Sequence, residues 1–247
     1  MPILFLILSL AGGPSPPEVS ASLAQASMLR EKLDEAGALA KYREALLEDS
    51  TNLEALWNAS YLATILGARD SLHHSPLMDL GRHLAEKAIQ QWPDQAESHF
   101  ALAVNIAMGL KHLPVRQKME SSRALREEIR RTLELNPRHG GAWFLLGRWQ
   151  YAYATLGTFE KMTAKLFLGG IPPEATLANA EVSFRNALQW NPNEPLFHLD
   201  LARTLVAEGR KDEARKVLVY AIHLAPRSGD DPRNFAKMRD LLKRIEG

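Results

Sequence analysis

Residues 180–195 read AEVSFRNALQWNPNEP, and residues 214–229 read ARKVLVYAIHLAPRSG. The two segments begin 34 residues apart, and both place a small residue, a bulky apolar residue, a second small residue and a proline at the same four positions. A fixed period of this length is typical of proteins that stack one pair of helices on the next. We therefore expect an all-α solenoid of helical hairpins.

The same four positions recur earlier in the chain at wider intervals. They are occupied by Ala38, Tyr42, Ala45 and Ser50, by Gly81, Ala85, Ala88 and Pro93, and by Leu125, Ile129, Thr132 and Pro137. Small side chains let neighbouring helices approach closely, and a proline ends a helix because it has no backbone N–H to donate. The pattern predicts helices, each paired with the helix after its proline turn, near residues 28–48, 53–66, 79–91, 95–108, 115–135, 139–154, 177–190, 195–208 and 211–224.

The last repeat is followed by sequence that predicts a C-terminal capping helix. Asp231 is expected to cap the helix N-terminus, with Pro232 at the first helical position. One face of this helix carries apolar residues, namely Phe235, Met238, Leu241, Leu242 and Ile245. A helix that is apolar inside and polar outside closes the end of a solenoid.

The largest insert between repeats spans residues 155–176. It contains the segment LFLGGIPPEAT at residues 166–176, which follows FLLGRWQYA at 144–152 and precedes AEVSFRNALQWNPN at 180–193. Together with Trp143 and the Leu-Gly pair that follows it, these segments resemble tetratricopeptide repeat proteins of the regulator of microtubule dynamics family. The resemblance implies tetratricopeptide-like repeats interrupted by such an insert, and association with microtubules, with tubulin as partner.

The first 26 residues differ in composition from the rest of the chain. Residues 3–11 read ILFLILSLA, which is too short to cross a hydrocarbon core of ~30 Å as a helix, so no transmembrane segment is expected. A secretory h-region of ~7–15 apolar residues fits better. We interpret residues 1–26 as signal-peptide-like or disordered, and residues 27–247 as the repeat domain. Cleavage would make the protein periplasmic or secreted; the alternative is a cytoplasmic, cytoskeleton-associated protein.

One face of the first helix in each predicted repeat supplies a candidate groove for a partner. Residues spaced by three, four and three positions share a helical face, and such faces line the concave surface of tetratricopeptide repeats. The candidate groove residues are Trp57, Tyr61, Phe100, Phe144, Arg148, Tyr151, Leu199 and Arg203. Aromatic side chains give rigid contact area, and guanidinium groups bind carboxylates, so the groove is predicted to hold a peptide or helix.

Two alternatives leave this groove unavailable to a partner. In the first, the insert at residues 155–176 folds into the groove and buries Trp57, Phe100 and Phe144 as core. In the second, the two candidate arginines form ion pairs within the protein and bind no ligand. Their internal partners would be Glu97, Glu160 or Asp200.

Charge gives little guidance to function at the level of the whole chain. Thirty Lys and Arg oppose 29 Asp and Glu, so bulk charge does not indicate nucleic-acid binding. Residues 111–138 hold eight basic groups and four Glu, which could attract an acidic partner or an anionic lipid surface. We interpret this run instead as a solvated helix face on which charges pair with one another.

Motifs that indicate catalysis or a bound cofactor do not occur. The absence of Cys excludes thiol nucleophiles and thiolate zinc sites, and no phosphate-binding loop, HExxH or GxSxG sequence appears. His73, His74 and His83 form the densest histidine cluster, and we interpret them as surface residues. The sequence therefore predicts no enzyme, no metal and no cofactor.

We expect a non-catalytic scaffold of the regulator of microtubule dynamics type that binds a protein or peptide. The alternative is an exported or periplasmic tetratricopeptide assembly factor that organises envelope or secretion components. Mass spectrometry of the mature amino terminus would separate the two.

Overall fold

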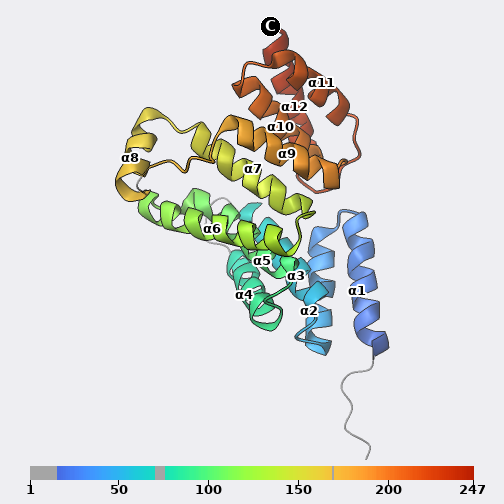
Figure 1. The fold of residues 1–247 in the computed structure, drawn as a ribbon. Helices are drawn as coiled ribbons and strands as arrows, with labels where there is room; N and C mark the ends of the chain where they lie inside the picture. Colours follow the sequence, from blue (N-terminus) through green and yellow to red (C-terminus); the bar gives the residue numbers. More distant parts are fainter. Residues whose placement is uncertain (1–15, 70–75, 169) are drawn as a thin grey trace, which may run out of the picture.

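The computed structural model describes residues 16–69, 76–168 and 170–247, and over these residues the chain is helical and contains no strand (Figure 1). The prediction of an all-α fold is therefore confirmed. The apolar stretch at residues 3–11 and the pair His73 and His74 lie outside the described residues. The helices are α1 (Pro16–Glu31), α2 (Glu35–Glu48), α3 (Leu53–Arg69), α4 (Pro76–Gln91), α5 (Ala96–Gly109), the 3-10 helix η1 (Leu110–His112), α6 (Val115–Leu135), α7 (Gly140–Ala154), α8 (Thr158–Leu168), α9 (Leu177–Trp190), α10 (Pro195–Ala207), α11 (Lys211–Ala221) and α12 (Asp231–Glu246).

The hairpins of the solenoid differ from the predicted helix pairs. The most extensive packing joins α1 with α2, α3 with α4, α5 with α6, α7 with α9, and α10 with α11. The helices on either side of a proline turn, such as α9 and α10, are neighbours from successive hairpins. The extra residues between repeats lie in the connections within hairpins, so insertions leave the contacts between hairpins intact.

The helix predicted at residues 28–48 is wrong, because this stretch contains a break. Leu33 adopts a positive φ of 60°, and the Asp34 carboxylate accepts a hydrogen bond from the backbone N–H of Gly37 at 2.9 Å. This cap starts α2 as a new helix. Helix α1 lies on both sides of the boundary predicted at residue 26, and Ala26 itself is fully buried in the N-terminal core.

The repeated small residues lie where the helices touch. Ala180, Ala187, Ala214 and Ala221 are all fully buried in the C-terminal core. A Cβ at Gly147 would come within 2.8 Å of the Phe184 ring, so the glycine lets α7 pack directly on α9. This close approach is the physical basis of the repeat pattern.

A repeated hydrogen bond braces the three turns between hairpins at Pro93, Pro137 and Pro192. The side chain six residues after the turn proline reaches back to the carbonyl oxygen of that proline. The ring nitrogens involved are Nε2 of His99 on Pro93 at 2.9 Å, Nε1 of Trp143 on Pro137 at 2.8 Å, and Nε2 of His198 on Pro192 at 2.8 Å. The brace fixes the direction in which the next helix starts.

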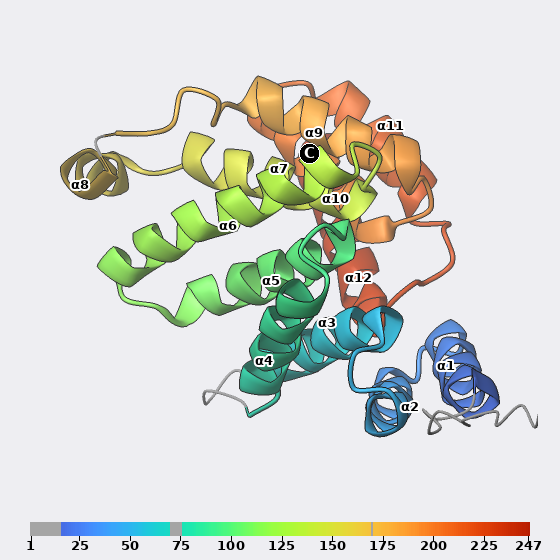
Figure 2. The same ribbon diagram turned by 60° about the horizontal axis from the view of Figure 1, so that its bottom comes forward.

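The insert does not fill the concave side of the solenoid. Figures 1 and 2 show α8 set apart from the body of the protein, where it packs against α6. Met162 and Leu166 on α8 are 68% and 78% exposed. No described residue of 155–176 lines the concave side, so the alternative in which the insert covers Trp57 and Phe100 is wrong; Phe144 is buried at 6% exposure, but within the C-terminal core.

The C-terminal helix caps the solenoid as predicted. Helix α12 packs against α10 and α11, and Met238 is fully buried there. Its N-cap is Asp230, not the predicted Asp231. The carboxylate of Asp231 instead accepts hydrogen bonds from the backbone N–H groups of Arg227 and Ser228 at 2.7 and 2.9 Å, and so shapes the loop before the helix.

Candidate functional site

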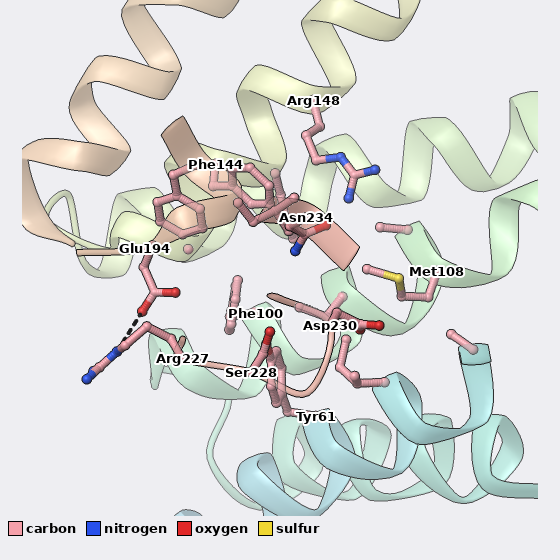
Figure 3. Close-up of a pocket in the computed structure, with 18 of the residues that line it drawn as sticks. Tyr61, Phe100, Met108, Phe144, Arg148, Glu194, Arg227, Ser228, Asp230 and Asn234 are labelled. Carbon is pink, nitrogen blue, oxygen red and sulfur yellow. Dashed lines mark ion pairs between the residues drawn. The ribbon is translucent and has the colours of Figure 1, made fainter. Parts of the chain in front are cut away.

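A cavity of about 810 Å³ lies on the concave side of the solenoid, and we call it the groove. The lining side chains come mainly from α3, α5, α7 and α10 and from residues 227–234, which we call the closing segment. Figure 3 shows Ser228 and Asp230 of the closing segment between Tyr61 below and Phe144 above. The groove is thus enclosed by repeats on one side and by the start of α12 on the other.

Aromatic rings form the repeat side of the groove. Tyr61 stacks on Phe100 with ring centroids 6.5 Å apart, and Phe100 contacts the ring of His139 at 4.3 Å. Phe144 stacks on Phe197 at 4.2 Å. Tyr61, Phe100, Phe144 and Phe197 lie on α3, α5, α7 and α10, the first helices of successive hairpins, so the repeats together assemble an apolar surface for a ligand.

A glycine at the start of α7 makes this arrangement possible. A Cβ at Gly141 would come within 2.6 Å of the Phe100 ring. The neighbouring His139 caps α7, because its Nδ1 accepts a hydrogen bond from the backbone N–H of Ala142 at 3.1 Å. Burial lowers the pKa of His139, which keeps the ring neutral and able to accept.

The structure brings most of the predicted groove residues together. Those that line the groove are Trp57, Tyr61, Phe100, Phe144 and Arg148. Tyr151 and Arg203 do not line it; Tyr151 packs beside the C-terminal core. The prediction is wrong for Leu199, which is fully buried, because α10 is rotated so that Leu196 and Phe197 face the groove instead.

The two predicted arginines share one internal carboxylate. Asp200 is buried, and its oxygens lie 3.5 Å from Nε of Arg148 and 2.8 Å from Nη1 of Arg203. Of the three acids considered from sequence, Asp200 is therefore the partner. Arg148 also lies over the ring of Phe144, 5.6 Å from its centroid. One carboxylate between two guanidinium groups leaves a net positive charge at this edge of the groove.

The closing segment is tied to the N-terminal repeats by residues that sequence reasoning missed. Arg69 at the end of α3 forms an ion pair with Glu35 of α2 and donates from Nε and Nη2 to Asp230 at 3.2 Å. The backbone N–H of Gly229 donates to Glu35 at 3.2 Å. No local pattern marks these residues, because Arg69 and Asp230 are 161 positions apart.

A second ion pair lies at the opposite side of the groove. Glu194 is 3.7 Å from Nε of Arg227. Figure 3 marks this ion pair with a dashed line. Burial raises the pKa of Glu194, and the nearby Arg227 opposes that shift.

Four of the eight basic residues at 111–138, namely Arg116, Arg126, Arg130 and Arg131, form ion pairs within the protein. Arg130 donates to Glu127 at 3.0 Å, Arg131 pairs with Asp94 at 2.8 Å, and Arg126 pairs with Glu174. The interpretation of this run as a solvated, self-paired face agrees with these contacts.

The described part of the chain shows neither a metal cluster nor a membrane span. No group of three or more metal-ligating His, Asp or Glu side chains comes together among the residues described. No helix among them is long and apolar enough to cross a membrane.

A family model and the relatives reported below name the same protein family. The family model described as "Regulator of microtubule dynamics protein 1-3" matches residues 22–246. Regulator of microtubule dynamics protein 3 of Xenopus laevis is 27% identical over 195 residues, which are 78% of this chain and 41% of that protein. The protein 3 of Rattus norvegicus is 29% identical over 168 residues, which are 68% and 35% of the two chains. Protein 1 of Caenorhabditis elegans is 27% identical over 142 residues, which are 58% and 62%.

The chain thus spans less than two thirds of the length of each of these relatives. Among solved structures, a thermophilic TPR protein of Thermus thermophilus matches with a TM-score of 0.67 and 17% identity, over 91% of this chain and 99% of that one. This likeness shows the tetratricopeptide fold.

Proposed function

The chain belongs to the regulator of microtubule dynamics family, and we propose that it is a non-catalytic scaffold that binds a peptide segment of a protein partner in the groove. Family membership and the tetratricopeptide fold support a role in protein interaction. The names of the relatives suggest microtubules as the structure on which this scaffold acts.

The observation that carries the proposal is the aromatic surface inside an enclosed groove. Tyr61, Phe100, Phe144 and Phe197 face a cavity that the insert leaves empty. A volume of about 810 Å³ falls within the ~300–1,000 Å³ range of ligand pockets. The closing segment crosses the concave side, so the space fits an extended peptide better than a whole helix.

Microtubule co-sedimentation tests the proposal directly. The full chain would be compared with a Trp57→Ala, Phe100→Ala variant, which removes groove rings that are partly accessible. The matched control is Tyr220→Ala, which removes a 54% exposed ring on α11, outside the groove. Thermal unfolding of each variant checks that the fold is retained.

We expect the groove variant to lose most of its sedimentation while the control behaves as the wild type. Equal sedimentation of both variants would place the binding surface elsewhere. If the wild type itself fails to sediment, the microtubule role of the relatives does not extend to this chain.

We also propose a cytoskeleton-associated location, in line with the names of the relatives. Export, the alternative, depends on residues 3–11, outside the described part of the chain. Mass spectrometry of the mature amino terminus distinguishes the two locations, since export removes this stretch.

A further inference from the structure

The groove contains more positive than negative side chains. Six basic residues line it, namely Arg30, Arg69, Lys111, Arg148, Arg227 and Arg233. Four acidic residues line it, namely Glu35, Glu194, Asp230 and Asp231. A ligand that enters the groove therefore meets a net positive surface set among aromatic rings.

The four acidic groups are already engaged. Arg69 pairs with Glu35 and Asp230, and Arg233 pairs with Asp230 at 2.7 Å. Glu194 forms an ion pair with Arg227, and Asp231 accepts hydrogen bonds from backbone N–H groups of the closing segment. These contacts offset the negative charges, so the four carboxylates repel an anionic ligand only weakly.

Two of the basic groups, in contrast, are held by neutral oxygen atoms. The guanidinium of Arg30 donates to the amide oxygen of Asn58 and lies 6.0 Å from the centroid of Trp57. The ammonium of Lys111 donates to the backbone carbonyl of Ala68 at 3.0 Å. Neither group forms an ion pair with a carboxylate among the described residues, so no internal partner offsets either positive charge.

A third positive region lies where α7, α10 and α12 meet. Arg148 and Arg203 share Asp200, and Arg148 remains 46% exposed. Burial and the charges of Arg233 and Arg203 lower the pKa of Lys237, although Asp200 and Asp230 act in the opposite direction. Positive potential therefore extends from the groove to its outer edge.

We infer that the partner segment held by the groove is an acidic peptide, in which carboxylates alternate with aromatic or large aliphatic side chains. This inference rests on the proposed function and specifies the chemistry of the ligand. The two uncompensated cations, Arg30 and Lys111, and the partly compensated Arg148 come from α1, η1 and α7, so a single anionic head group cannot reach all of them. A chain with several separated carboxylates can, while its apolar side chains cover the rings.

The test uses the full chain and fluorescein-labelled peptides, with binding followed by fluorescence anisotropy. One peptide repeats Glu with interspersed Phe and Ser, and the matched peptide carries Gln at every Glu. We expect the Glu peptide to bind at least about tenfold more tightly than the Gln peptide. We also expect its affinity to fall as salt is added, because salt screens the attraction.

Protein variants locate the effect. Arg30→Gln with Lys111→Gln removes the two uncompensated charges and should weaken the Glu peptide about tenfold or more. The matched control, Lys118→Gln with Arg123→Gln, removes the same charge from exposed positions of α6 outside the groove. It should bind as the wild type does. The salt dependence of the wild type tests the inference independently of how well the variants fold.

The outcomes separate this inference from the proposed function. If the Glu and Gln peptides bound equally well, and the Trp57→Ala, Phe100→Ala variant bound neither, the acidic ligand would be overturned. The proposal of a peptide-binding groove would be retained. If the aromatic variant bound the peptides as tightly as the wild type, or if neither peptide bound, both the acidic ligand and the peptide groove would be overturned. Capture of phosphatidylserine vesicles without binding of the Glu peptide would replace the peptide with an anionic lipid surface.

Discussion

The two sides of the groove are built by different means. The repeat side consists of rings on the first helices of successive hairpins, such as Tyr61 and Phe100, which stack on one another. The closing segment is held by ion pairs, chiefly that between Arg69 and Asp230, which are 161 positions apart. A periodic sequence therefore defines one side of the site, while contacts between distant parts of the chain define the other.

Substitutions on the repeat side should lower the stability of the protein more than substitutions on the closing side. Ala187→Leu places extra volume where a fully buried alanine lets α9 approach its neighbours. Overpacking of this kind costs about 1–3 kcal/mol, so we expect a clear loss of stability in urea denaturation. Val182→Leu on the same helix is the control, because Val182 is 56% exposed and should change stability little. Equal stability of the two variants would show that the close helix contact is not a stability determinant.

The closing side should respond with a smaller, more local change. Arg69→Ala removes the shared partner of Glu35 and Asp230, and partly exposed ion pairs of this kind contribute about 1 kcal/mol or less. We expect a modest fall in the melting temperature and faster proteolysis in residues 225–230. The control is Arg82→Ala, which removes an exposed pair with Glu86. Unchanged proteolysis would mean that the ion pairs do not hold the closing segment in place.

The repeat side should also give the protein a pH-dependent stability, through His139 at the start of α7. The pKa of His139 is lowered from 6.5 by burial, so its contribution to stability is present above pH 6.5 and is lost as pH falls toward the folded-state pKa. His139→Asn keeps a cap acceptor that does not titrate. We expect the wild type to lose more stability than this variant between neutral and mildly acidic pH. The comparison cancels the contributions of His198 and Glu194, which both proteins retain.

Substitutions in the insert should have the smallest effect on stability and binding. They test whether α8 contributes to either side of the groove. Met162→Ser with Leu166→Ser changes two exposed residues on a helix that contacts the body through α6. We expect the free energy of unfolding to stay within about 0.5 kcal/mol of the wild type, and peptide affinity to be unchanged. A loss of groove binding would show that α8 reaches the groove in solution.

Much of the repeat side could be predicted from sequence because helical spacing places residues on one face. Trp57, Tyr61, Phe100, Phe144 and Arg148 were found in this way and line the groove. The same rule failed at Leu199, since spacing alone does not reveal how a helix is rotated about its axis. His139 was not singled out, because the sequence predicted it as the first residue of the helix at 139–154, whereas the structure has it as the N-cap of α7.

The sequence by itself determined the stack of helices, the bounds of the predicted helices after residue 50 to within three residues, and the aromatic character of the groove, but not which helices pair as hairpins. These follow from local spacing, from small residues at contacts and from prolines at turns, all of which act between near neighbours in the chain. Only the tertiary structure decided that α8 stands outside the groove, that Asp200 is shared by two arginines, and that residues 227–234 close the site. Those features depend on how the whole solenoid curves, because its curvature alone brings distant charges within hydrogen-bonding distance.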